Sequence, residues 1–149
     1  GGRDSYTGDN TTEKVVEALD SLGTSPSFLF IHYKAADVVA HRSGDQGEQY
    51  REAIIENDAQ LGDVIQMLSL RGLLDSTDIF VTTDHGFSGI FHVNIDLPSV
   101  SQTWLASRRP ILKTTPASVL DVTPTVLDAL GIDVAGFEPP YRGMSWIQH

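Results

Sequence analysis

One apolar stretch that ends in polar residues of metal-binding type constrains the fold of this chain most. The run over about 78–83 is followed at once by Asp84, His85 and Gly86, and His92 lies a little further on. A short apolar run of this kind is typical of a buried strand, and open α/β sheets carry their chemistry at the carboxyl ends of their strands. Glycine allows the chain to turn sharply at position 86. The stretch therefore predicts a strand that delivers a functional site.

The bulk composition limits the kinds of site that are open to the chain. Its 149 residues, of which 40% are hydrophobic, suit a single globular domain over 1–149. There is no cysteine, so a metal would have to bind His, Asp or Glu. A net charge of −10 argues against a nucleic-acid scaffold and against binding to anionic membranes through a basic face. No apolar stretch approaches the roughly 18 residues of a membrane span, and nothing indicates a compartment.

The other predicted elements suggest a layered fold. The apolar run over 27–33 predicts a strand buried on both faces, as in a parallel sheet. Helices are expected at about 11–22, 47–71 and 122–130, the last capped by Asp121, and a further short strand at 102–106. Elements in this order predict an α/β fold, with α/β/α layers around a mostly parallel sheet.

A second pair of candidate ligands lies in the segment after the first strand. Asp37 and His41 fall in a predicted loop over 34–46, with the i, i+4 spacing that lets two side chains share one site. Right-handed crossovers place both ligand-bearing loops at the same edge of a parallel sheet. We therefore expect Asp37, His41, Asp84, His85 and His92 to converge.

Two further residues of metal-binding type, His32 and Asp58, are not interpreted as ligands. His32 lies inside an apolar run, so it is expected to be a core histidine or one that supports the site from behind. Asp58 falls on the apolar side of its predicted helix and is expected to be satisfied by hydrogen bonds, because a buried carboxylate needs them.

Clustered Asp and His side chains suit chemistry on phosphoesters, which are anions and need positive charge beside them. Two divalent ions on the order of 4 Å apart activate a nucleophile on one side and stabilise the leaving oxygen on the other. Mixed Asp and His ligands favour zinc, and they also admit manganese.

These motifs resemble those of the alkaline phosphatase superfamily, and most closely its type I phosphodiesterase/nucleotide pyrophosphatase branch. The resemblance rests on Phe28-Leu-Phe-Ile-His-Tyr followed by Asp37-x-x-x-His41, then on Asp84-His85-Gly86 and His92. It continues through Asp58-Ala-Gln-Leu-Gly, the late helix Asp121-Val-Thr-Pro-Thr-Val-Leu-Asp and Tyr141-Arg-Gly-Met-Ser, and so spans about residues 12–146.

The resemblance implies a role for each candidate. Asp37, His41 and His92 would hold one zinc ion, and Asp84 and His85 would hold a second. The chain would form the C-terminal part of an alkaline phosphatase-like catalytic domain acting on a small-molecule phosphoester. The family's nucleophilic Thr or Ser lies upstream, and nothing in residues 1–23 matches that segment. The incomplete sheet would then be covered by the missing N-terminal half or by another chain.

Other functions stay open. The chain could be a metal-binding fragment or an interaction module without turnover, or an α/β domain whose His and Asp side chains merely cap loops. Within the superfamily, the Asp-x-x-x-His pair disfavours a sulfatase. The residues after Asp-His-Gly place a phosphomutase below a hydrolase.

Overall fold

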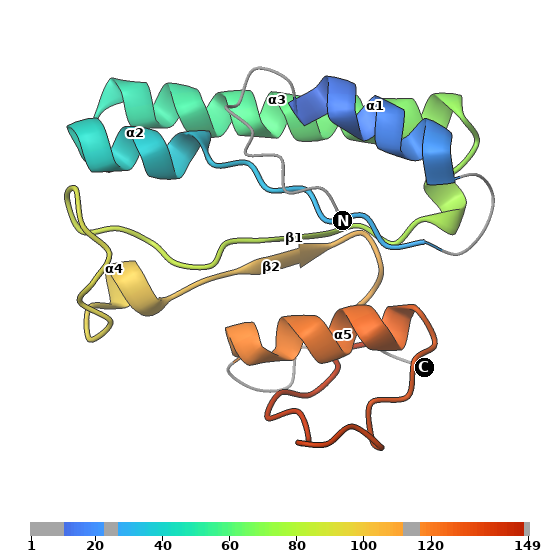
Figure 1. Cartoon of the computed structure of the whole chain (residues 1–149). Helices are drawn as coiled ribbons and strands as arrows, with labels where there is room; N and C mark the ends of the chain where they lie inside the picture. The colour runs from blue at the N-terminus through green and yellow to red at the C-terminus, as the bar shows by residue number, and fades with distance from the viewer. Residues whose placement is uncertain (1–10, 23–26, 112–116, 148–149) are drawn as a thin grey trace.

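A computed structural model describes residues 11–22, 27–111 and 117–147 of the chain. The helices are α1 (Thr11–Leu22), α2 (Ala35–Ser43), α3 (Glu48–Leu70), α4 (Pro98–Ser101) and α5 (Val122–Ala129), with short 3-10 turns η2 (Leu74–Ser76) and η3 (Val119–Asp121). The strands are β1 (Phe80–Thr82) and β2 (Leu105–Ser107). Figure 1 shows α1, α2 and α3 on one side of the strand pair and α5 on the other.

The three predicted long helices are confirmed as α1, α3 and α5. Helices α1 and α3 pack through Val15, Val64 and Leu68, which form the buried core cluster. Gly72, with φ of 69°, follows the end of α3, as expected for a glycine that adopts a left-handed conformation. Asp58 is exposed on α3, so its expected burial is wrong. None of the helices in the described part of the chain combines the length and apolar character that crossing a membrane requires.

The predicted loop over 34–46 is wrong, because most of it forms helix α2. Alanine is the strongest helix former, and Ala35, Ala36 and Ala40 all lie in this short helix. The Ala40 side chain is fully buried, and Gly44 ends the helix with φ of 85° and a backbone hydrogen bond to Ala40. The consequence for the site is that Asp37 and His41 lie one helical turn apart on a rigid element.

The sheet differs from the predicted one in the direction of its strands. Strand β1 falls within the predicted range, and β2 begins three residues later than expected, at Leu105. Phe80 pairs with Ser107 and Thr82 with Leu105, so the two strands are antiparallel. The chain returns from β1 to β2 through residues 83–104, which hold one short helix, α4, and not the long helix that usually forms the crossover between parallel strands. Helices with a small antiparallel sheet are consistent with an α/β fold, and the layered parallel sheet is not confirmed.

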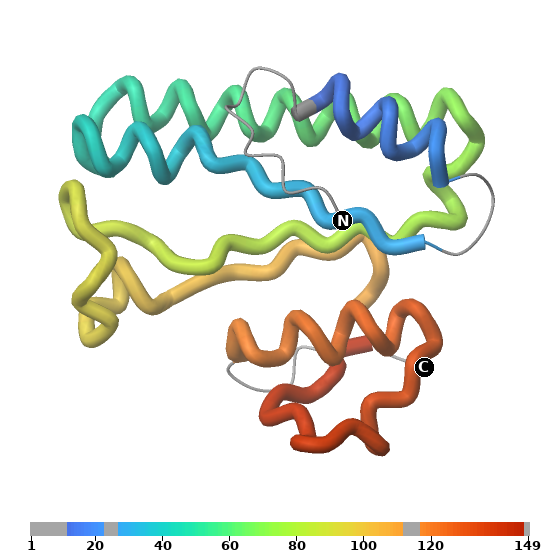
Figure 2. The backbone as a smooth tube through the Cα atoms, in the orientation of Figure 1, coloured from blue at the N-terminus to red at the C-terminus, as the bar shows by residue number. Residues whose placement is uncertain are grey.

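The predicted strand over 27–33 is also wrong. This segment, light blue in Figure 2, is extended and runs beside β1, but it is not part of a strand ladder. Ile31 packs against the core cluster, as Ile79 does, whereas Phe28 and Phe30 are 59% and 76% exposed. A strand needs a hydrogen-bonded neighbour, and burial on two faces needs packing on both; the described residues cover one face only.

The exposure of this segment also overturns the expected role of His32. Its side chain is exposed, and its ring stacks on Phe30 with centroids 6.4 Å apart. His32 is therefore a surface residue rather than a core histidine, and its ring contacts Phe30 rather than a candidate ligand.

The C-terminal segment is fastened to α5 by buried polar groups. The Asp121 carboxylate accepts hydrogen bonds from the backbone N–H groups of Ser118 and Met144, both at 2.8 Å. The sequence predicted that the Asp121 side chain caps α5, and this is wrong. The side chain instead closes the turn η3 that precedes the helix. Thr125 Oγ1 accepts from the backbone N–H of Trp146 at 3.2 Å. These bonds satisfy groups that would otherwise be costly to bury.

Candidate metal centre

Helix α2 contributes two of the candidate ligands. Asp37 and His41 are spaced by four residues and share one face of the helix, with His41 Nε2 3.6 Å from Asp37 Oδ1. Both side chains are 43% exposed, so their ligand atoms are accessible to ions from solvent.

The loop after β1 is held in place by backbone contacts. Gly86 donates its N–H to Val100 O at 2.8 Å, and a Cβ at this position would lie 2.1 Å from Ser99 O. Only glycine fits such an approach. Further along, Ser88 and Phe91 exchange two backbone hydrogen bonds, and the N–H of Asp45 donates to Gly89 O at 3.1 Å. The loop is thus attached to α4 on one side and to the end of α2 on the other.

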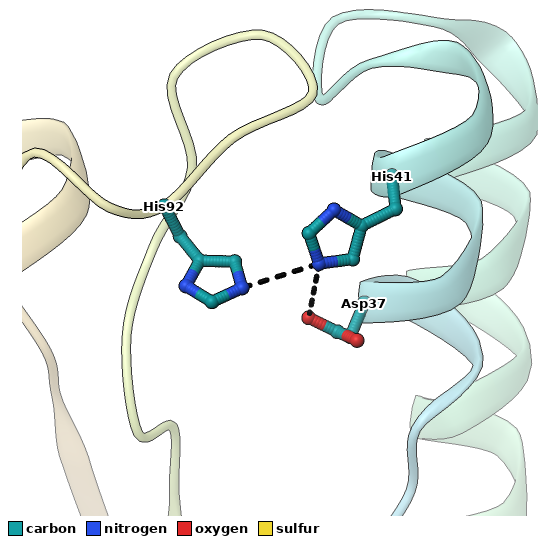
Figure 3. A group of neighbouring side chains, drawn as sticks. All are labelled: Asp37, His41 and His92. Carbon is teal, nitrogen blue, oxygen red and sulfur yellow. Dashed lines mark hydrogen bonds and ion pairs between the residues drawn. The ribbon is translucent and has the colours of Figure 1, made fainter.

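His41 is oriented by this loop. Its Nδ1 lies 2.9 Å from Ile90 O, and because a carbonyl oxygen can only accept, Nδ1 carries the proton. The lone pair of the neutral ring is then on Nε2, which faces Asp37 and lies 3.1 Å from His92 Nε2. Figure 3 shows His92 reaching from its loop toward the two side chains of α2. Imidazole bound to a backbone carbonyl at one nitrogen is the usual arrangement of a metal-binding histidine.

The three side chains in Figure 3 fit the requirements of a divalent metal ion. One ligand atom from each of Asp37, His41 and His92 lies within 4.8 Å of the others. A tetrahedral zinc ion with bonds of about 2.0–2.1 Å separates its ligand atoms by about 3.3 Å. The spacings of 3.1 Å (His41 to His92) and 3.6 Å (His41 to Asp37) lie on either side of that value. Two imidazoles and a carboxylate leave the fourth position open.

His85 and Asp84 adjoin this group. His85 Nε2 is 3.6 Å from Asp84 Oδ2 and 3.9 Å from Asp37 Oδ1, and Nδ1 lies 3.1 Å from Gly86 O. Its ring stacks on His92, with centroids 3.9 Å apart and planes at 15°. Asp84 lies at the margin, with a side chain that is 79% exposed. The structure thus brings all five predicted residues into one cluster, in which Asp37 is close to both His41 and His85. The assignment of the five residues as ligands stays a prediction.

Two neighbours of the cluster were not singled out from the sequence as site residues. Phe87 is buried and contacts the rings of His41, His85 and His92. Tyr50 of α3 lies near the acidic side of the site, where burial, and then the carboxylates of Asp45 and Asp37, raise the pKa of its phenol. The signal for Phe87 was an aromatic residue directly after Asp-His-Gly. Tyr50 carried no signal beyond helical spacing.

Comparison with known proteins identifies the family. The sequence profile described as type I phosphodiesterase / nucleotide pyrophosphatase matches residues 4–120, which is most of the chain. The chain belongs to this family. The resemblance inferred from the motifs is therefore confirmed. Members of the family are metal-dependent, and the assignment indicates phosphodiester or phosphoryl-transfer chemistry.

Two relatives of this family member come from the same superfamily, alkaline phosphatase. The bis(5'-adenosyl)-triphosphatase enpp4 of Mus musculus is 31% identical over 71 residues, or 47% of the chain and 16% of the relative. The 2,3-bisphosphoglycerate-independent phosphoglycerate mutase of Halobacterium salinarum is 31% identical over 133 residues, or 82% of the chain and 24% of the relative. The chain thus spans a quarter or less of the length of either protein. No solved structure matches it.

Proposed function

We propose that this chain contributes a two-zinc centre to an enzyme that hydrolyses phosphoesters, as a phosphodiesterase or a phosphatase. The observation that carries the proposal is the convergence of Asp37, His41 and His92 from two separate segments, with ligand atoms within 4.8 Å of one another. The family assignment supports the reaction class.

The proposed ligand sets follow the two groups in the cluster. Asp37, His41 and His92 would hold one ion, and Asp84 with His85 would hold the other. Both sets combine oxygen and nitrogen donors, which suits zinc and admits manganese. The 3.9 Å between His85 Nε2 and Asp37 Oδ1 supports this pairing, because the two ions of a two-metal centre are close neighbours.

When bound, the two ions would supply positive charge to the attacking and leaving oxygens of a phosphoester. The protein's own contribution is orientation. The carbonyls of Ile90 and Gly86 hold the Nδ1 atoms of His41 and His85, so that both Nε2 atoms face the cluster. The partly exposed Asp37 and His41 keep it open to a small-molecule phosphoester.

The rest of the catalytic domain is part of the same proposal. Residues 1–149 would form one domain that corresponds to the C-terminal part of an alkaline phosphatase-like fold, with its α/β/α layers and parallel sheet completed by other strands. The missing N-terminal half or another chain would cover Phe28 and Phe30 and supply the nucleophile. Of residues 1–23, in which no nucleophile motif is expected, residues 1–10 and 23 lie outside the described residues.

A second candidate is phosphoryl transfer of the mutase type. The phosphoglycerate mutase of Halobacterium salinarum aligns with 82% of the chain, and this alignment supports phosphoryl transfer as the second candidate. The two functions differ in the fate of the phosphoryl group. A hydrolase releases it to water, whereas a mutase returns it to a hydroxyl of the substrate.

Calorimetric titration of orthophosphate into the zinc-loaded chain and into the metal-free chain tests the proposal. Phosphate should bind only the zinc-loaded form, and His92→Ala should remove binding while His32→Ala, which lies outside the cluster, retains it. A zinc-loaded chain that binds no phosphate would refute a phosphoester site. Hydrolysis of bis(4-nitrophenyl) phosphate should stay far below about 1 per second. Faster turnover would show that this chain has all the groups that the reaction needs.

A further inference from the structure

We propose that Phe87 is a positioning residue, which sets the ring planes of His41, His85 and His92 before a metal arrives. This inference rests on the proposed metal centre, and it adds a residue that neither the sequence motifs nor the comparisons assign. Phe87 is 7% exposed, and its burial brings it against imidazoles rather than into the core cluster of α1 and α3.

The contacts of Phe87 have one geometry in common. Its ring centroid lies 5.1 Å from that of His41, 5.4 Å from His85 and 5.2 Å from His92. The interplanar angles are 80°, 65° and 79°, so all three contacts are edge-to-face, the arrangement that aromatic quadrupoles prefer. One phenyl ring thus contacts three candidate ligands that come from two segments.

The backbone on both sides of Phe87 is fixed, which gives the ring a defined place. Gly86 is held by Val100 O at 2.8 Å and lies against Ser99. Ser88 pairs with Phe91 through two hydrogen bonds. A side chain between two anchored residues can act as a rigid wall, whereas one on a free loop would move with its ligands.

The Phe87 ring restricts a motion of the imidazoles that their hydrogen bonds still allow. The carbonyls of Ile90 and Gly86 hold His41 and His85 at one nitrogen each, which still allows each imidazole to tilt. His92 is held by other means, since its ring stacks on His85 and lies edge-to-face with Phe87. Contact with a buried phenyl ring restricts the tilt of all three rings, so less order has to be imposed when a metal binds.

Phe87→Leu tests this role, because leucine keeps a buried apolar side chain and removes the ring. Zinc affinity measured by calorimetry should fall by about tenfold or more, the usual cost of losing a residue that orients ligands. Phe80→Leu is the matched control: it removes a partly buried phenylalanine from β1, outside the cluster, and should leave zinc affinity unchanged. Equal affinity of parent and Phe87→Leu, with the variant shown to be folded by circular dichroism, would overturn the proposal.

A second measurement decides the question without zinc and without a variant. In the metal-free parent, nuclear Overhauser effects should connect the Phe87 ring protons to all three imidazoles and not to His32. Their absence would overturn the positioning role even if Phe87→Leu failed to fold. A parent that binds no zinc would refute the proposed function instead. The nuclear Overhauser effects would still test the ring contacts in that case, because they are measured without metal.

Discussion

His41 Nε2 lies 3.1 Å from His92 Nε2, although the two residues are 51 positions apart in the chain. With the proton of His41 on Nδ1, its Nε2 lone pair faces the second imidazole and a carboxylate. This lone pair can accept a hydrogen bond from the second imidazole or bind a metal ion. The same contact joins α2 to the loop after β1, so the proposed ligand set and the local fold depend on each other.

Gly86→Ala should disturb both stability and metal binding. The added Cβ would lie 2.1 Å from Ser99 O, so the loop that bears His85 and His92 has to move. We expect the free energy of unfolding to fall by about 1–3 kcal/mol, as for other overpacked sites, and zinc affinity to fall with it. Urea denaturation and calorimetry measure the two effects. Gly62→Ala is the control: no atom lies within 4 Å of its added Cβ in helix α3, and it should leave zinc affinity unchanged. Similar results for both variants would contradict this packing.

Asp121→Asn should weaken the attachment of the C-terminal segment. The carboxylate accepts two backbone N–H groups, from Ser118 and Met144, and an asparagine has only one acceptor oxygen for them. Urea denaturation should show a loss of about 1–3 kcal/mol, because the asparagine brings an N–H₂ donor against one of these backbone donors beside a buried side chain. Asp75→Asn changes an exposed aspartate that pairs with Arg108, and it should have little effect. A loss for Asp75→Asn as large as that for Asp121→Asn would argue against the buried network.

Tyr33→Phe should leave the protein as stable as the parent or raise its free energy of unfolding by up to about 1 kcal/mol. The Tyr33 hydroxyl is buried and has no hydrogen-bond partner among the described residues, so removing it costs no bond. Tyr141→Phe, at a tyrosine that is 39% exposed, should leave the free energy of unfolding unchanged at pH 7. A clear loss of stability in Tyr33→Phe would reveal a partner for the hydroxyl.

The same variant predicts a dependence on pH. Burial, and then the nearby carboxylate of Asp63, raise the pKa of Tyr33 above its ordinary value of 10.0. The unfolded chain then ionises first, so the parent loses stability as the pH rises above 10.0 toward the folded-state pKa. Tyr33→Phe lacks this contribution and should lose less stability between pH 7 and about pH 10.5. Equal losses in urea denaturation would contradict the shift.

The helices could be predicted from the sequence because their apolar spacing is a local signal. Helix α2 was missed, since it is short and its Asp37 and His41 suggested a loop. The burial of the segment that contains Phe28 and Phe30 could not be predicted, because it depends on what packs against that segment. Strand direction likewise depends on the path of the chain between β1 and β2.

The candidate site was more accessible to prediction than the sheet. The types of residue at Asp84, His85 and His92 carry the chemistry, and their positions after an apolar run indicated a shared site. The structure brings them to Asp37 and His41 by way of α2 and an antiparallel loop rather than by crossovers of a parallel sheet. Phe87 was missed as a site residue because an aromatic side chain in a sequence does not show what it contacts.

Equilibrium dialysis against zinc tests the central claim most directly. The parent and His32→Ala should each take up two ions, Asp84→Ala with His85→Ala should reduce uptake to one, and His41→Ala with His92→Ala should remove the ion held with Asp37. His32→Ala is the matched control, since it removes an exposed histidine outside the cluster. No zinc uptake by the parent, or uptake by the two double variants equal to that of His32→Ala, would contradict the account.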